Sequence, residues 1–456
     1  MRSESEAAHE ARPPGLLVML AALLPFGLGY FLSYLYRAAN AVVAPDLVRD
    51  IGLSAGELGL LTSAYLLAFA LFQLPLGILL DRYGPRRVQA ALVAIGGLGA
   101  VVFGLGQDAR TLLLARAIIG LGFAGGLMSA FKAVVIWVPE PRRALANSCV
   151  MSIGALGLLV ATAPLEAAVQ AFGWRHVFLG VAAFTMLVAV LILVVVPERG
   201  APERATAERG TPERGAPERE AAKQAISVRA QIGEVAQILR NPVVLALAPL
   251  LAITVGVHVS IQTLWVGPWF RDVGGLDRTA VANRLFVMAA AFFAGILITG
   301  AVADWLARRG VSLLNVMLGF MMIFFLAQAC IIFELEGHDM LIWSLFGMTG
   351  QVSVLAFPWL SSYFGAALSG RANTAVNLPM FMSAFAFQYA IGAVIDLYPL
   401  SPAGGYAPDA YATAFAILLA AELAALLWYL SNRHHIATAE QIVQAAYRAR
   451  ATGGKA

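Results

Sequence analysis

The sequence predicts an all-α membrane protein with twelve transmembrane helices, arranged as two related bundles of six. The 456-residue chain is 60% hydrophobic and only 13% charged, whereas a soluble domain carries about 25% charged residues. Its apolar runs are long and do not alternate strictly between apolar and polar residues. In lipid the backbone must satisfy its own hydrogen bonds, so long unalternating runs favour helices over a closed β-barrel.

Twelve runs are long enough to cross a bilayer, for which a helix needs roughly 20 apolar residues. Short connections join most of them, so consecutive helices should run antiparallel. The N-terminal tail is polar and acidic rather than signal-like, so we expect the first span to be retained. The expected spans are 15–44, 56–80, 88–107, 111–138, 147–170, 175–196, 242–270, 281–303, 312–335, 340–367, 374–398 and 408–431.

The connection at 197–240 differs from the others. It repeats Pro-Glu-Arg and Glu-Arg-Gly and is charged throughout, so it cannot bury a core and is predicted to be a disordered or partly helical linker. It divides the helices six and six. The expected organisation is a tail at 1–14, a bundle at 15–196, the linker at 197–240, a second bundle at 241–431 and a tail at 432–456.

The distribution of basic residues predicts the orientation of the helices. Paired arginines occur at 86–87, 142–143 and 308–309, in loops on the same side as the linker and both termini. Loops on the other side carry single arginines. Because cytoplasmic loops are enriched in Lys and Arg, both termini are predicted to be cytoplasmic, in a multi-pass protein of a bacterial-type inner (plasma) membrane.

A loop motif follows the second span, where the sequence reads GILLDRYGPRRVQ. It resembles the signature loop between helices two and three of the major facilitator superfamily. The residues that carry the resemblance are Gly77, Asp81, Arg82, Gly84, Arg86 and Arg87. A weaker echo, GAVADWLARRG, follows the eighth span and contains Gly300, Asp304, Arg308 and Arg309. Two equivalent Gly-x-x-x-Asp spacings are expected of duplicated six-helix halves.

These loops have a physical interpretation as well as a family one. Gly77 and Gly300 are expected to let neighbouring helices approach closely. Asp81 and Asp304 lie at helix ends, where a carboxylate can pair with loop arginines or with a helix N-terminus. The resemblance implies that this region acts as a conformational latch rather than a substrate site. The simpler alternative, charges that only set topology, explains the arginines but not the spaced Gly and Asp.

Two further stretches resemble the same superfamily. In the fourth span, Arg116, Gly120 and Gly122 are similar to its Arg-x-x-x-Gly-x-Gly pattern, which implies a role in coupling or helix packing. The first span ends in a Tyr-x-x-Arg formed by Tyr34 and Arg37, which resembles the organic-anion symporter branch and implies contact with an anionic substrate. Asn40 lies one turn further on. The sequence departs from that branch at 123–126, where the glutamate linked to proton coupling is missing.

Few ionisable residues lie within the spans, and most of those are basic. An ionisable side chain in lipid is costly, so each is a candidate functional residue. A cavity lined by Arg37, Lys132 and His258 would favour an anion through charge-assisted hydrogen bonds. Each also has an alternative: Arg37 and Lys132 could extend to the membrane surface, and His258 could be a neutral core residue. Glu166 and Asp396 lie nearer the outer helix ends.

The seventh span continues the polar face that begins at His258. Gln262 and Trp265 follow at helical spacing, so they are expected to lie on the same face and to contact substrate. Pro268 should bend the helix near its outer end. The aromatic-belt alternative fits Trp269 better than Trp265.

The expected function is secondary active transport of a small anionic organic metabolite, by alternating access and with proton-coupled uptake. The rivals are a proton-coupled exporter of amphipathic compounds or metabolites and a non-transporting membrane sensor with a transporter fold. The sequence contains no P-loop, metal-ligand spacing or dinucleotide loop, so neither an enzyme nor a cofactor or metal is expected. The expected partners are the substrate, protons and the bilayer, with no nucleic acid, and the protein is expected to be a monomer.

Overall fold

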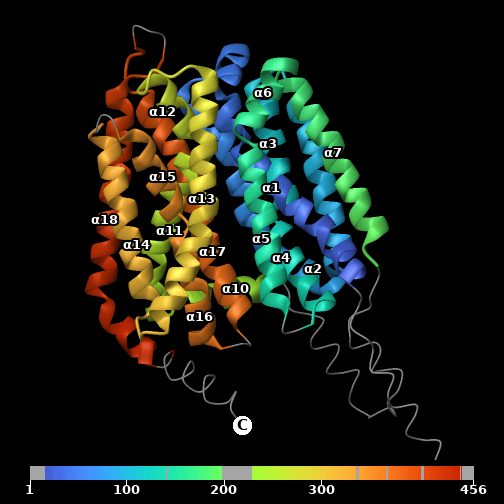
Figure 1. The fold of residues 1–456 in the computed structure, drawn as a ribbon, viewed down its shortest axis with the longest axis vertical. Helices are drawn as coiled ribbons and strands as arrows, with labels where there is room; N and C mark the ends of the chain where they lie inside the picture. Colours follow the sequence, from blue (N-terminus) through green and yellow to red (C-terminus); the bar gives the residue numbers. More distant parts are fainter. Residues whose placement is uncertain are drawn as a thin grey trace, which may run out of the picture.

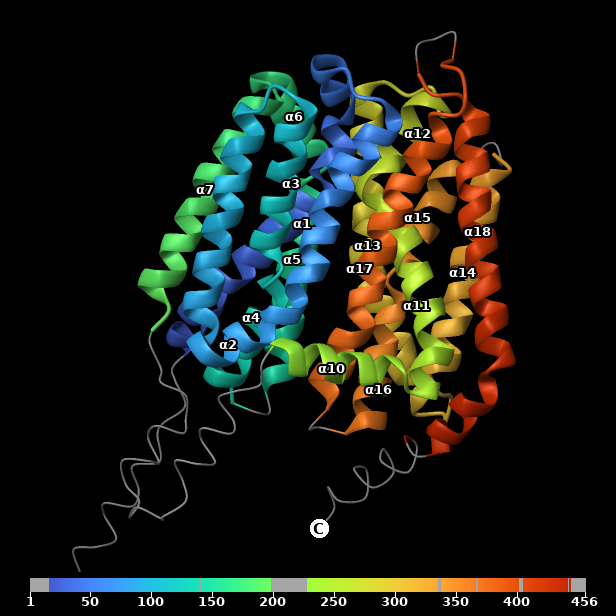
Figure 2. The same ribbon diagram turned by 180° about the vertical axis from the view of Figure 1, so that it is seen from behind.

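The computed structural model describes residues 16–139, 142–197, 228–334, 338–365, 368–401, 405–441 and 443. Within them the chain forms two bundles of long helices that stand side by side (Figures 1 and 2). Ten helices of this described part are long and apolar enough to cross a membrane, or eleven if one bent pair counts as a span. Helix α1 is 36 residues long and carries no charge before Arg37. The predicted fold class is confirmed.

In the N-terminal bundle, one long helix contains two successive spans, and two other spans are each made of two consecutive helices. Its helices are α1 (Leu16–Ile51), α2 (Ala55–Leu105), α3 (Ala109–Phe123), α4 (Gly126–Trp137), α5 (Arg143–Val160), α6 (Ala163–Phe172) and α7 (Trp174–Val195). Helix α2 holds the second and third spans, which turn at Gly84 with a φ of 76°, a conformation that glycine adopts at little cost. The fourth span is α3 with α4, and the fifth is α5 with α6, bent by 45°.

The C-terminal bundle also contains discontinuous spans. After the helix α10 (Val228–Leu239), its elements are α11 (Pro242–Ser260), η2 (Ile261–Trp265), α12 (Val266–Asp272), α13 (Arg278–Ala307), α14 (Leu313–Ile332), α15 (Asp339–Thr349), η3 (Val352–Leu355), α16 (Ala356–Phe364), α17 (Ser369–Ile395) and α18 (Pro408–Ser431). The seventh span changes from α-helix to π-helix at η2, and the tenth contains the 3₁₀ turn η3. Broken helices of this kind line cavities in transporters.

Helix α10 lies within the segment that was expected to be disordered or partly helical. It runs across one end of the molecule and contacts α2 and α17, which belong to different bundles (Figure 2). We call this end the linker end and the opposite one the distal end. Residues 433–441 are also helical. They pack at the linker end, where the indole of Trp359 donates a 2.7 Å hydrogen bond to Glu440.

Polar caps fix where several helices begin at the distal end. Ser54 and Glu57 form a reciprocal capping box at the start of α2. Asp108 and Asp277 accept hydrogen bonds from the backbone three residues further on, at the starts of α3 and α13. Each cap satisfies an amide that the helix cannot. The caps therefore mark the depth at which these spans leave the apolar region.

Glycines let helices within each bundle touch backbone to backbone. A Cβ added at Gly120 would lie 2.1 Å from the carbonyl oxygen of Tyr65, and one at Gly295 would lie 2.2 Å from that of Met348. Gly300 is different, because a Cβ there would meet nothing within 4 Å. Gly77 is exposed. The expected close approach at Gly300 is therefore wrong, and Gly120 is one of the residues that provides such a contact.

Candidate functional site

Arg37 is the buried cation at the centre of the candidate site. It lies on α1 and is only 7% exposed. Its guanidinium carbon lies 5.0 Å from the ring centre of Tyr34, 5.1 Å from Phe69, 5.2 Å from Phe381 and 5.9 Å from Tyr65. Among the described residues, no carboxylate forms an ion pair with it. Ring faces attract the guanidinium but do not neutralise its charge.

Arg116 lies beside this site but is part of the packing of the N-terminal bundle. It is fully buried, donates a 2.8 Å hydrogen bond to the carbonyl of Tyr36, and lies over the ring of Tyr65 at 5.2 Å. Gly120 and Gly122 allow α3 to approach α2 closely. These three residues of the helix-four pattern therefore hold the helices next to Arg37, and the ring of Tyr65 contacts both arginines.

Asn40 continues the polar face of α1 one turn beyond Arg37. Its amide nitrogen donates a 2.8 Å hydrogen bond to the hydroxyl of Thr62 on α2, while its amide oxygen has no described partner. Asn40 is fully buried. It therefore presents an unused acceptor near Arg37.

His258 lies in an aromatic pocket of the C-terminal bundle. It is fully buried, and neither ring nitrogen has a partner among the described residues. The rings of Phe292, Phe324 and Phe346 surround it, with centres 5.9, 6.0 and 5.7 Å away. Phe292 also lies 6.2 Å from Tyr34. One ring thus connects His258 to the Tyr-x-x-Arg face of the other bundle.

Gln262 and Trp265 follow His258 along η2 as predicted, but their contacts differ. The amide nitrogen of Gln262 is buried without a described partner, and Gln262 lines a cavity of about 10 Å³ with Ala38 and Ala41 of α1. The indole of Trp265 donates a 3.0 Å hydrogen bond to the carbonyl of Gln388. Gln262 thus faces the boundary between the bundles, whereas Trp265 is bonded within its own.

Lys132 does not join the other predicted site residues. Its amine donates a 2.8 Å hydrogen bond to the carbonyl of Leu80. Leu80 lies fifteen residues along α2 from Tyr65, which contacts Arg37. At 1.5 Å per residue this separation is roughly 22 Å. Lys132 therefore belongs to the linker end, and the cavity that we expected it to share with Arg37 and His258 is not formed.

The predicted latch residues lie at the linker end. Arg86 donates to the carbonyl of Leu193 on α7, so this described contact stays within the N-terminal bundle. Arg82, Arg87, Asp304 and Arg308 are exposed, and the side chain of Asp81 lies outside the described part of the chain. A latch role for this loop stays a prediction.

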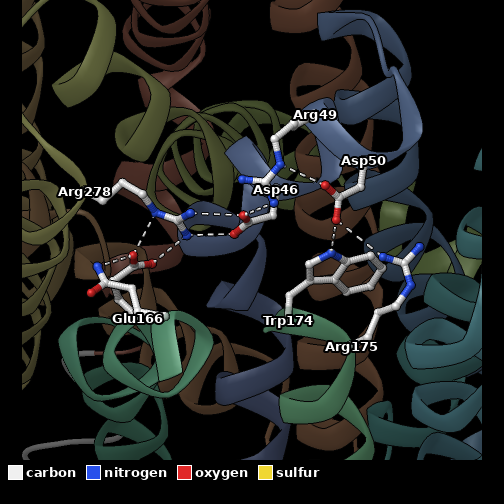
Figure 3. Close-up of polar contacts among 8 residues, drawn as sticks. Asp46, Arg49, Asp50, Glu166, Trp174, Arg175 and Arg278 are labelled. Carbon is white, nitrogen blue, oxygen red and sulfur yellow. Dashed lines mark hydrogen bonds and ion pairs between the residues drawn. The ribbon is translucent and has the colours of Figure 1, made fainter. Parts of the chain in front are cut away.

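The distal end holds an ion cluster that joins the two bundles (Figure 3). Arg278, the first residue of α13, contacts Asp46 of α1 at 2.7 and 3.0 Å and Glu166 of α6 at 2.8 and 3.2 Å. One arginine of the C-terminal bundle thus binds two carboxylates of the N-terminal bundle, each through two hydrogen bonds. Such paired charge-assisted bonds combine strength with a fixed geometry. We call Arg278, Asp46 and Glu166 the distal ion cluster.

Two helix contacts close the same end. Asp396, just after α17, accepts hydrogen bonds from the amides of Ala55 and Gly56 at 2.9 and 2.8 Å, so it caps α2 from the other bundle. A Cβ at Gly392 would lie 2.3 Å from the carbonyl oxygen of Ala55, and one at Gly267 would lie 2.2 Å from that of Ala41. The two bundles are therefore in backbone contact at the distal end.

Two features have no assigned role in the sequence-based prediction. Arg278 and Asp46 were not selected, because nothing local in the chain indicates that they meet. Glu422 of α18 was not selected either, although it is fully buried and its carboxylate oxygens have no described partner. The signal for Glu422 was present, since it is a single carboxylate within an apolar run.

Two helical bundles that meet around a buried cation and close at one end form the architecture of a secondary transporter. The chain belongs to the Major Facilitator Superfamily, whose sequence pattern matches residues 26–388. It is 30% identical to the probable sulfoacetate transporter SauU of Cupriavidus necator, over 34% of this chain and 36% of that protein. It is 28% identical to the 4-hydroxybenzoate transporter PcaK of Pseudomonas aeruginosa, over 43% of this chain and 44% of that protein.

These alignments span 36% and 44% of the relatives' length. The fold is similar over much more of the chain. The crystal structure of a D-xylose-proton symporter superposes with a TM-score of 0.66 at 15% identity, covering 90% of this chain and 97% of that one. At this identity the likeness concerns the fold alone.

Proposed function

We propose that this transporter carries a small organic anion and that Arg37 binds it. The observation that supports this is a guanidinium that is buried between the bundles without a carboxylate partner. A charge inside a membrane protein is costly unless it is paired. An anionic substrate would supply the missing charge through charge-assisted hydrogen bonds. The names of two relatives, which refer to sulfoacetate and 4-hydroxybenzoate, agree with this substrate class.

We also propose that the anion is taken up into the cell together with a proton. The linker end, with its paired arginines, faces the cytoplasm, and the distal end faces outward. An anion that enters a cell with a negative interior is opposed by roughly 2.3 kcal/mol per charge per 100 mV. Uptake therefore requires a co-transported cation, and a proton is the simplest choice. His258, buried without a described partner for either nitrogen, is the candidate proton-binding residue.

Arg37→Ala tests the anion proposal directly. Purified protein should be stabilised against heat by at least one carboxylate of a metabolite library, and the variant should need about 10- to 100-fold more of it, because a hydrogen bond to a charged group is lost. Arg110→Ala is the matched control, since Arg110 is an exposed arginine at the distal end. An anion that stabilises Arg37→Ala as well as the parent protein would refute the role of Arg37.

Proton symport is tested separately, by measuring uptake of the anion into proteoliposomes. An uptake rate that is independent of both the pH gradient and the membrane potential would refute symport.

A further inference from the structure

Aromatic side chains surround Arg37, and further rings pack against those that contact it. Tyr65 and Phe69 are stacked with an interplanar angle of 17°. Phe69 meets Phe381 of the other bundle, with ring centres 4.6 Å apart. Tyr34, which also contacts Arg37, lies 5.2 Å from Tyr30 and 6.2 Å from Phe292. These rings form two groups, contributed by α1, α2, α13 and α17, and both groups contact Arg37. We call the six rings the collar.

The collar offers few polar atoms, and two of its three hydroxyls already donate or share a hydrogen bond. The hydroxyl of Tyr65 is bonded to Ser33, and that of Tyr30 donates to that of Tyr34. Phe69, Phe292 and Phe381 offer no polar atom. Against these rings a polyhydroxylated ligand would lose water from its hydroxyls and gain few partners, because the unused amide oxygen of Asn40 lies one turn further along α1. The cost is large for each hydroxyl that stays unpaired. A planar apolar ligand would instead gain ring contacts.

Among the described residues, Arg37 is the permanent positive charge that contacts collar rings of both bundles. His258, beside Phe292, is positive only when it carries the co-transported proton. Arg116 also contacts the ring of Tyr65, but it is bonded to the carbonyl of Tyr36. Lys132 is bonded at the linker end, roughly 22 Å along α2 from Tyr65. A second carboxylate on the ligand would therefore face phenyl rings. This favours a ligand with one negative charge.

We propose that the anion bound by Arg37 is an aromatic monocarboxylate. This rests on the function proposed above and narrows its substrate class. The carboxylate pairs with the guanidinium, and the ring packs against Tyr34, Tyr65 and Phe69, which all belong to the N-terminal bundle with Arg37.

Phe381 occupies the position that the ring of the ligand would take. It belongs to the C-terminal bundle and covers both Arg37 and Phe69 in the described conformation. When α17 moves away from α2, Phe381 leaves the collar. The ring of the ligand then takes its place against Phe69. Phe381 thus occupies the binding position in the empty carrier, and its removal should not weaken binding.

Thermal stabilisation of the full-length protein in detergent by benzoate and by D-glucuronate tests the inference. Both probes carry one carboxylate on a six-membered ring, but only benzoate is aromatic and free of hydroxyls. Benzoate should act at a concentration at least tenfold lower than D-glucuronate. Phe69→Leu should weaken benzoate by about 2- to 12-fold, the contribution of one aromatic pair. Phe381→Leu should leave benzoate binding unchanged or tighter.

Phe387→Leu is the matched control, because Phe387 lies on α17 but packs against Gly256 within the C-terminal bundle. Should Phe69→Leu fail to fold, Phe69→Met keeps the volume and repeats the test. If D-glucuronate binds as tightly as benzoate and both need Arg37, the aromatic inference is overturned while the anion carrier stands. Equal weakening by Phe69→Leu and Phe381→Leu also overturns it. If neither probe nor any other carboxylate needs Arg37, the proposed function itself fails.

Discussion

At the scale of single residues, the two buried arginines of the N-terminal bundle show how context decides the use of a charge. Both contact the ring of Tyr65. Arg116 is tied to the carbonyl of Tyr36 and sits among helices of one bundle. Arg37 is surrounded by rings that include Phe381 of the other bundle. Only Arg37 therefore changes its surroundings when the bundles move relative to each other.

Gly120→Ala should lower the stability of the protein. The new Cβ would lie 2.1 Å from the carbonyl oxygen of Tyr65, so α2 and α3 would have to separate. Overpacking of this kind costs about 1–3 kcal/mol, which exceeds the gain of about 1 kcal/mol from replacing a helical glycine. The midpoint of thermal unfolding in detergent should fall. Gly180→Ala is the control, because its Cβ would meet nothing and should leave the midpoint unchanged or higher.

At the scale of helices, glycine contacts fall into two groups. Gly120 and Gly295 join helices of the same bundle, whereas Gly267 and Gly392 join helices of different bundles at the distal end. In a rigid-body model of alternating access, contacts of the first group persist and those of the second group break. Substitution in the first group should therefore lower the stability of the protein, whereas substitution in the second group should shift the balance between its conformations.

Gly392→Ala should shift the protein toward a conformation that is open at the distal end. Its Cβ would lie 2.3 Å from the carbonyl oxygen of Ala55, so the clash exists only while α17 touches α2. Spin labels at Phe172 and Leu397, which are 69% and 80% exposed, report the distal distance in a background without Cys149 and Cys330. The distance distribution should lengthen. Gly370→Ala, on the same helix but in open space, should leave it unchanged.

At the scale of the whole molecule, the distal contacts define the described conformation. The distal ion cluster and the Asp396 cap both link the bundles at that end. A cavity of about 30 Å³ lies beside the cluster, which leaves room for about one water. A substrate therefore cannot pass the distal end until these contacts break. Breaking them is a required step in any alternating-access cycle that the protein performs.

Arg278→Gln should favour the distal-open conformation. The change would leave Asp46 and Glu166, each only 5% exposed, without their shared cation. Removing one partner of a buried pair costs roughly 3–5 kcal/mol, and less is expected here because the Arg278 side chain is 34% exposed. The same spin-label pair should report longer distances. Arg284→Gln is the control, since Arg284 pairs with Asp339 inside the C-terminal bundle. Equal distributions for the two variants would show that the cluster does not hold the distal end closed.

The sequence by itself determined the membrane class and the family resemblance of the loop at 77–87, and it predicted a division into six helices and six. Those properties depend on hydropathy and spacing, which are local in the chain. It also selected Arg37, because a charge within an apolar run is a local signal. It predicted a disordered or partly helical linker but not the bounds of the helix α10, since a charged linker composition does not fix where a short helix forms.

Only the tertiary structure decided which side chains meet. It brought Phe381 to Arg37, directed Lys132 to Leu80 instead, and joined Arg278 to Asp46 across 232 residues of sequence. Such pairings depend on how the helices cross and how deeply each one sits. Those relations are set by packing over the whole molecule, including the backbone contacts at Gly120 and Gly392. No spacing within a single span contains that information.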